Sequence, residues 1–70
     1  MRAGEIRVRH SSAVTHCIVR NVSTIGALIE VKLADDVPDD FELIVDSITL
    51  HESCAVVRRT KHMLGVRFQA

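Results

Sequence analysis

Residues 21–31 read NVSTIGALIEV, a short polar segment followed by an apolar run. Asn and Ser side chains can hydrogen-bond their own backbone in a turn, and glycine can take positive φ without a Cβ clash. The run from Ala27 to Val31 has the composition of a β-strand. The stretch therefore predicts a chain reversal that leads into a strand. A bound ligand would explain the same polar residues, so both interpretations stay open at this point.

Strand patterns continue on both sides of this stretch. Apolar and polar residues alternate, or β-branched residues cluster, in six segments separated by turn residues. We expect strands over residues 5–9, 17–20, 27–31, 41–45, 48–59 (with a bend) and 63–68. Six short strands with little or no helix predict an all-β fold, a small six-stranded antiparallel barrel, because closure removes unpaired strand edges.

Length and composition limit the architecture. A chain of 70 residues has room for one domain, residues 1–70, and its 47% hydrophobic but only 3% aromatic content predicts a core of aliphatic side chains. The longest apolar run has four residues, which predicts no membrane span and no signal peptide, hence a cytoplasmic protein. In that compartment Cys17 and Cys54 are expected to be buried thiols.

Three segments resemble those of PilZ domains. The order Asn-x-Ser-x-x-Gly at residues 21–26 is similar to the second PilZ signature, VPDDFELIV at 37–45 to the segment entering the middle strands, and CAVVRRTKHMLGVRF at 54–68 to the closing hairpin. The resemblance implies a six-stranded barrel and a module of bacterial cyclic di-GMP signalling. It also implies that Asn21 and Ser23 hydrogen-bond a guanine edge or a phosphate, and that Gly26 lets this ligand approach the backbone.

One part of the family pattern is missing. PilZ domains that bind cyclic di-GMP strongly carry Arg-x-x-x-Arg ahead of the first strand, where guanidinium groups grip phosphate and stack on guanine. Here Arg2 and Arg7 are five apart and Arg7 and Arg9 two apart, so we expect that segment to be shortened or absent. The arginines that could replace the clamp, if the fold brings them near Asn21, are Arg2, Arg20, Arg58 and Arg59.

The favoured function is therefore a PilZ-type adaptor that acts through a protein partner, with weak or absent cyclic di-GMP binding. Residues 33–57, with seven acidic residues and no Lys or Arg, are one surface it could use. The alternative is a genuine cyclic di-GMP receptor with substitute arginines. A third interpretation, nucleic-acid binding by the basic residues 58–62, lacks the aromatic side chains that stack on bases.

Other chemistries find little support. His16 and Cys17 are strand neighbours that point to opposite faces, so they do not form a zinc site with His51 and Cys54. The acidic residues 35–40 lack the glycine and terminal glutamate of a calcium loop. No nucleophile elbow or phosphate loop is present, so we expect no catalytic residues, no metal, no cofactor and no enzyme activity. The oligomeric state is left open.

Overall fold

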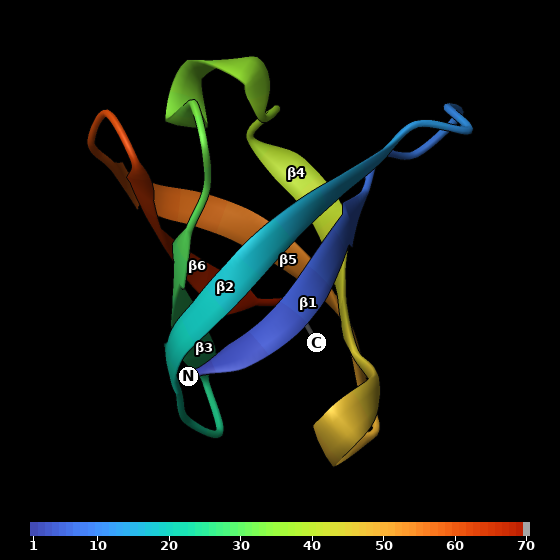
Figure 1. Cartoon of the computed structure of the whole chain (residues 1–70), viewed down its shortest axis with the longest axis vertical. Coiled ribbons are helices and arrows are strands. Elements are labelled where there is room, and N and C mark those ends of the chain that lie inside the picture. The colour runs from blue at the N-terminus through green and yellow to red at the C-terminus, as the bar shows by residue number, and fades with distance from the viewer. Residues whose placement is uncertain (70) are drawn as a thin grey trace.

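The computed structural model describes residues 1–69 and forms a closed antiparallel barrel (Figure 1). The strands are β1 (Arg2–Arg7), β2 (Val14–Val22), β3 (Gly26–Glu30), β4 (Asp40–Val45), β5 (Leu50–Arg59) and β6 (Met63–Phe68). Around the barrel their order is β1-β2-β3-β6-β5-β4, and β1 closes the wall by pairing with β4. The predicted all-β, six-stranded barrel is confirmed.

Within the described residues 1–69, helical structure is limited to two short 3-10 turns, η1 (Ala34–Asp36) and η2 (Asp46–Ile48). The break between the strands expected at 41–45 and 48–59 is therefore a 3-10 turn, and the connection between β3 and β4 contains another. Within residues 1–69, no helix is long and apolar enough to cross a membrane.

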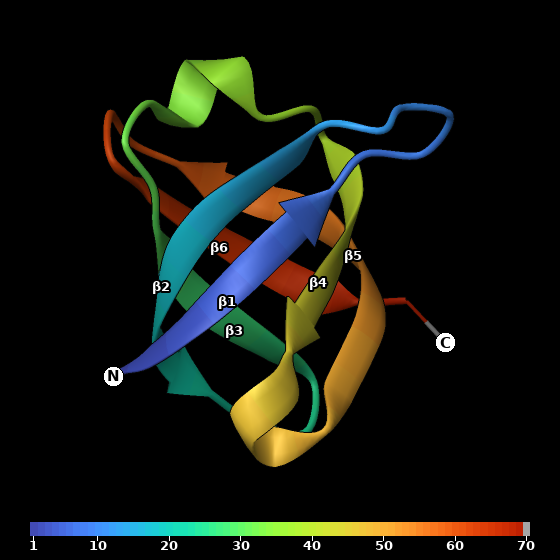
Figure 2. The ribbon, with the colours of Figure 1, turned by 45° about the vertical axis from the view of Figure 1, so that its right-hand side comes forward.

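The prediction for the first strand was wrong at both ends. β1 begins at Arg2 and ends at Arg7, so Val8 and Arg9 lie outside it. Arg7 is the last residue of β1 with a partner on either side, opposite Val14 on β2 and Glu42 on β4. Beyond this point the β1–β2 connection projects from the barrel, as Figure 2 shows. The alternation of Ile6 and Val8 thus continues beyond Arg7, the last residue of β1 that pairs with a neighbouring strand.

The barrel interior is filled by small and branched apolar side chains, as the composition predicted. Alternate residues of each strand point inward, and Phe41 is the one aromatic among the buried residues. The buried set comprises Ile6, Cys17, Val19, Ile29, Val31, Ala34, Val37, Phe41, Leu43, Val45, Cys54, Leu64 and Val66.

Both cysteines are buried and free, in agreement with the prediction of buried thiols. Burial, with a smaller contribution from Glu5, raises the pKa of the Cys17 thiol to about 11. Burial also raises the pKa of Cys54 to about 11, helped by the nearby charge of Glu52. Both thiols are therefore protonated, weak nucleophiles at neutral pH.

Two β-bulges change which side chains face outward. One extra residue, Arg20, lies between the pairs Val19–Ile29 and Asn21–Leu28 of β2 and β3. Another, Val57, lies between Val56–Val66 and Arg58–Gly65 of β5 and β6. A bulge shifts the two-residue alternation by one, so residues after it change face. The predicted bend in the long fifth strand is confirmed, and Figure 2 shows β5 curving along its length.

Candidate binding face

The two bulges place Asn21 and Arg58 in one row on the outside of the barrel. Asn21 pairs with Leu28, Leu28 pairs with Gly65, and Gly65 pairs with Arg58, so the row crosses β2, β3, β6 and β5. Without the bulges, alternation from Val19 and Val56 would turn Asn21 and Arg58 into the core. We call the exposed surface around this row the outer β3–β6 face.

One shallow hollow lies on this face, and a second lies at its edge. The first, of about 320 Å³, is lined by Asn21, Val22, Ser23, Ile25, Gly26, Ala27, Leu28, Val57, Val66 and Arg67. The second, of about 460 Å³, is lined by Thr24, Ile25, Glu52, Arg67, Phe68 and Gln69. Ile25 and Arg67 border both hollows, so the two hollows form a continuous surface.

Ser23 is held by its own turn. Its Oγ accepts hydrogen bonds from the backbone N–H groups of Ile25 and Gly26, each at 3.3 Å, and donates one to the Gly26 carbonyl oxygen at 3.3 Å. A hydroxyl group has one donor and two acceptor positions. The turn therefore uses the full hydrogen-bonding capacity of Ser23, although its side chain borders the first hollow.

Gly26 has a packing reason for its lack of a side chain. The structure has no glycine with positive φ among the described residues, so the expected left-handed conformation is not what this position requires. Instead, a Cβ on Gly26 would collide with the Val66 carbonyl oxygen of β6. Close approach of two backbones, in place of a special φ, excludes larger residues here.

Asn21 is the member of the predicted signature whose side chain is exposed to the first hollow and makes no hydrogen bond within residues 1–69. Its amide offers two donors and one acceptor group to a binding partner.

Two of the predicted substitute arginines are engaged elsewhere. Arg20, the bulged residue of β2, donates to Glu30 at 2.6 Å, and both side chains are exposed. Arg2 lies opposite Val19 at the start of β1, and its Nη1 is 3.5 Å from the Ser47 Oγ. Neither arginine borders the two hollows.

Arg58 and Arg59 are sequence neighbours with opposite environments. Arg58 is exposed on the outer β3–β6 face, about 14 Å from Asn21 if three strand spacings separate them. Arg59 points toward the barrel end, where its Nη1 donates to the carbonyl oxygens of Ala34 and Val37. Its Nη2 also donates to Asp39 at 2.8 Å. Arg59 is thus a structural residue, and Arg58 is the one available for binding.

Arg67 is the residue that sequence reasoning missed. It is exposed, lies opposite Gly26 across the β3–β6 pair, and borders both hollows. It makes no ion pair within residues 1–69. The alternation of β6, with Leu64 and Val66 inward, signals that Arg67 points outward. Its position opposite Gly26 depends on strand register, which short-range patterns do not encode.

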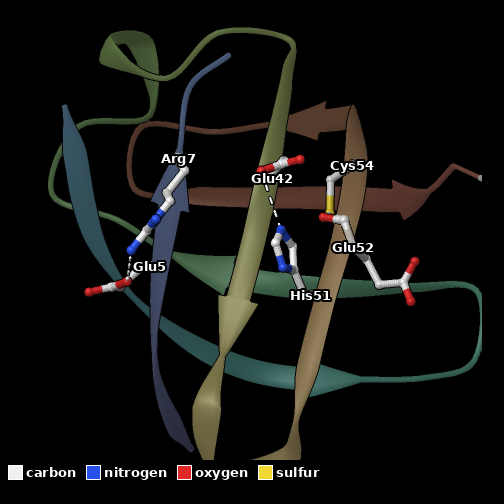
Figure 3. Close-up of polar contacts among 6 residues, drawn as sticks. All are labelled: Glu5, Arg7, Glu42, His51, Glu52 and Cys54. Atoms are coloured by element: carbon white, nitrogen blue, oxygen red, sulfur yellow. Dashed lines mark hydrogen bonds and ion pairs between the residues drawn. The ribbon is translucent and has the colours of Figure 1, made fainter. Parts of the chain in front are cut away.

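The opposite wall of the barrel, formed by β1, β4 and β5, carries paired charges (Figure 3). Arg7 Nη2 lies 3.6 Å from Glu5 Oε1, and His51 Nε2 lies 3.3 Å from Glu42 Oε1. In residues 1–69, no group of three or more His, Cys, Asp or Glu side chains is arranged to hold a metal ion. The outer β3–β6 face is therefore the surface that combines exposed apolar side chains with unpaired arginines.

Comparisons with known proteins agree with the motifs in the sequence. The family described as PilZ domain matches residues 2–70, nearly the full length of the chain. No curated protein and no solved structure matches significantly.

Proposed function

Because the chain belongs to the PilZ domain family, whose members are binding and adaptor modules of bacterial cyclic di-GMP-related signalling, we propose that it is a cytoplasmic adaptor acting through protein contacts. In this proposal it binds cyclic di-GMP weakly or not at all and catalyses no reaction. The whole of residues 1–70 forms one functional domain.

The observation that carries the proposal is the state of the signature residues. The Ser23 hydroxyl makes its hydrogen bonds within the turn, and the close backbone of β6 leaves no room for a side chain at Gly26. Of the expected substitute arginines, Arg59 and Arg20 bind groups of the chain itself. Each bidentate arginine–phosphate pair contributes on the order of 1.5–3 kcal/mol, so losing two pairs costs several powers of ten in affinity.

Direct cyclic di-GMP binding remains the second candidate, because Arg67 borders the same hollow as Asn21 and Arg58 is exposed at the far end of the row, and neither arginine has an ion-pair partner in residues 1–69. These two guanidinium groups could face the two phosphates of the ligand in place of the missing clamp. The two candidates differ in affinity and in which substitutions matter.

The test is a titration of isotope-labelled protein with cyclic di-GMP, followed through the backbone amide shifts in NMR spectra. We expect no saturable shift at Asn21, Gly26 or Arg67 below millimolar ligand. Saturable shifts at micromolar ligand that disappear in Arg67→Ala but persist in Arg9→Ala would establish the receptor and contradict the adaptor proposal. Arg9 is the matched control because it is exposed outside both hollows.

Ser23→Ala adds a stability readout. Removing three hydrogen bonds from the turn should lower the free energy of unfolding by about 1 kcal/mol, measured by urea denaturation. Ser12→Ala, at an exposed position whose side chain makes no hydrogen bond within residues 1–69, should change it by less than about 0.5 kcal/mol. If Ser23→Ala leaves stability unchanged, the turn does not depend on this hydroxyl and the argument from Ser23 fails.

A further inference from the structure

The outer β3–β6 face exposes an unusual amount of apolar surface. Ile25 and Val57 are each 66% exposed and Leu28 is 39% exposed, and all three border the first hollow. Phe68, half-buried, adds apolar surface to the second hollow. Exposed apolar side chains that gather beside polar groups are typical of protein interaction surfaces.

Two guanidinium groups beside this apolar surface form no ion pair within residues 1–69. Arg7, Arg20 and Arg59 each form an ion pair with a carboxylate, whereas Arg58 and Arg67 form none within residues 1–69. Glu52 borders the second hollow with Arg67 but is not in ion-pair contact with it. A complementary partner therefore brings carboxylates of its own.

The closed wall restricts the backbone conformation of such a partner. Residues 27–30 of β3 and 64–67 of β6 have strand partners on both sides, so an extended peptide finds no free strand edge within the outer β3–β6 face. A helix satisfies its own backbone groups and can bind through side chains alone. The barrel surface therefore favours a helical segment over an extended one.

Two other occupants fit the face less well. In a two-fold contact between copies of this chain, the same surface meets itself, which would bring Arg58 and Arg67 toward their counterparts. Nucleic acid requires exposed aromatic side chains for stacking, whereas Phe41 is buried and Phe68 half-buried.

We propose that the outer β3–β6 face binds an acidic amphipathic helix of a protein partner. This inference rests on the proposed adaptor function, since it names the class of partner. Two apolar side chains one helical turn apart would enter the two hollows that share Ile25 as a border. A carboxylate beside them would accept hydrogen bonds from Arg67, which borders both hollows.

The experiment selects partners without presupposing their charge. A displayed library of helical peptides of about 16 residues is selected against the immobilised protein, and the enriched peptides are synthesised with a fluorophore. We expect them to combine apolar residues three or four apart with Asp or Glu beside them. Fluorescence anisotropy then measures their affinity for the wild type and the variants, and added salt should weaken binding.

Matched variants locate the binding surface. Ile25→Ser and Arg67→Ala should each weaken binding by about tenfold or more, whereas Val14→Ser and Arg9→Ala should change it by less than about twofold. Val14 is 41% exposed at the start of β2, so its replacement tests a general loss of surface hydrophobicity. Thermal unfolding of each variant checks that the barrel is intact.

Several outcomes would overturn the inference. They are the absence of enriched peptides, enrichment of basic or uncharged peptides, and equal weakening by the control variants. Self-association in sedimentation velocity that Ile25→Ser abolishes would assign the face to a second copy of the chain.

The adaptor proposal fails separately. If cyclic di-GMP binds at micromolar concentration, the adaptor proposal is wrong whatever the peptides show. If peptides bind but neither Ile25→Ser nor Arg67→Ala weakens them, and cyclic di-GMP does not bind, the adaptor proposal stands and only this surface is wrong.

Discussion

The two connections that flank β3 satisfy their backbone polar groups in different ways. The β2–β3 turn is short, and the Ser23 backbone and hydroxyl satisfy it locally through Ile25 and Gly26. The β3–β4 connection, residues 31–39, is too long to satisfy itself. Its carbonyl groups receive hydrogen bonds from Arg59 on β5 and from the ring of His62, whose Nδ1 donates to the Lys32 carbonyl at 2.7 Å.

This difference decides which side chains in each region remain free to bind a partner. At the long connection, the guanidinium group of Arg59 donates its hydrogen bonds to backbone carbonyls and to Asp39. Near the short turn, Ser23 and the Phe68 backbone N–H supply the hydrogen bonds, so the side chains of Asn21 and Arg67 stay available and Ile25 is exposed. Local satisfaction of a turn frees the neighbouring surface for binding, whereas a long connection recruits residues from distant strands.

The largest expected effect is at the short turn. Gly26→Ala places a Cβ against the Val66 carbonyl oxygen, a backbone atom that cannot move alone, and should lower the free energy of unfolding by about 3 kcal/mol. Gly65→Ala is the control, because its Cβ would lie 3.3 Å from the Cβ of Arg58, and we expect a change within about 1 kcal/mol. Urea denaturation measures both. Equal effects would show that β6 does not approach Gly26 as closely as described.

A smaller effect is expected at the long connection. Arg59→Ala leaves the carbonyl groups of Ala34 and Val37 without their charged donor and should lower the free energy of unfolding by about 2 kcal/mol. Arg58→Ala should change it by less than about 0.5 kcal/mol, since Arg58 is exposed. Chemical denaturation of the two variants compares adjacent arginines directly. A larger loss for Arg58→Ala would reverse the assignment of inward and outward sides after the bulge at Val57.

The smallest effect per side chain concerns the core between the two connections. Because burial raises the pKa of Cys17 and Cys54 from 9.0 to about 11, both thiols are protonated in the folded and unfolded states at neutral pH. Between pH 9 and 11 the unfolded state ionises first, so stability is lost as the pH rises through this window. We expect each thiol to contribute a fall of about 1 kcal/mol at pH 10 relative to pH 8.

The control for this pH dependence is the double variant Cys17→Ala, Cys54→Ala, whose free energy of unfolding should fall less over the same interval. A thiol reagent should react with the wild type only as fast as the barrel opens. Rapid reaction of both thiols at neutral pH would contradict their burial.

Much of the fold was predictable because its signals are local. The alternation around Cys17 and Val19 and the apolar run at 27–31 identified strands, and the break expected between the strands 48–59 and 63–68 is confirmed. The limits of β1 were not predictable, since Val8 continues the alternation of Ile6 but has no partner strand. An apolar pattern shows that a strand can form, whereas pairing decides where it ends.

The candidate site was predictable in part. The signature from Asn21 to Gly26 was found from its spacing, and it does border the first hollow. The roles of the arginines were not predictable, because a bulge at Val57 decides that Arg58 faces outward and Arg59 inward. Arg67 was missed because its proximity to Gly26 follows from the register of β3 and β6, which are distant in sequence.

The sequence by itself determined the class of fold, the family signature and the aliphatic core, because residue type and two-residue periodicity act over a few neighbours. Only the tertiary structure decided which polar groups remain available. Ser23 and Arg59 use their side-chain hydrogen bonds on the backbone, whereas Asn21, Arg58 and Arg67 are all exposed on the outer β3–β6 face. The physical reason is that register, bulges and barrel closure join residues far apart in the chain, and hydrogen-bonding capacity used within the fold is lost to a partner.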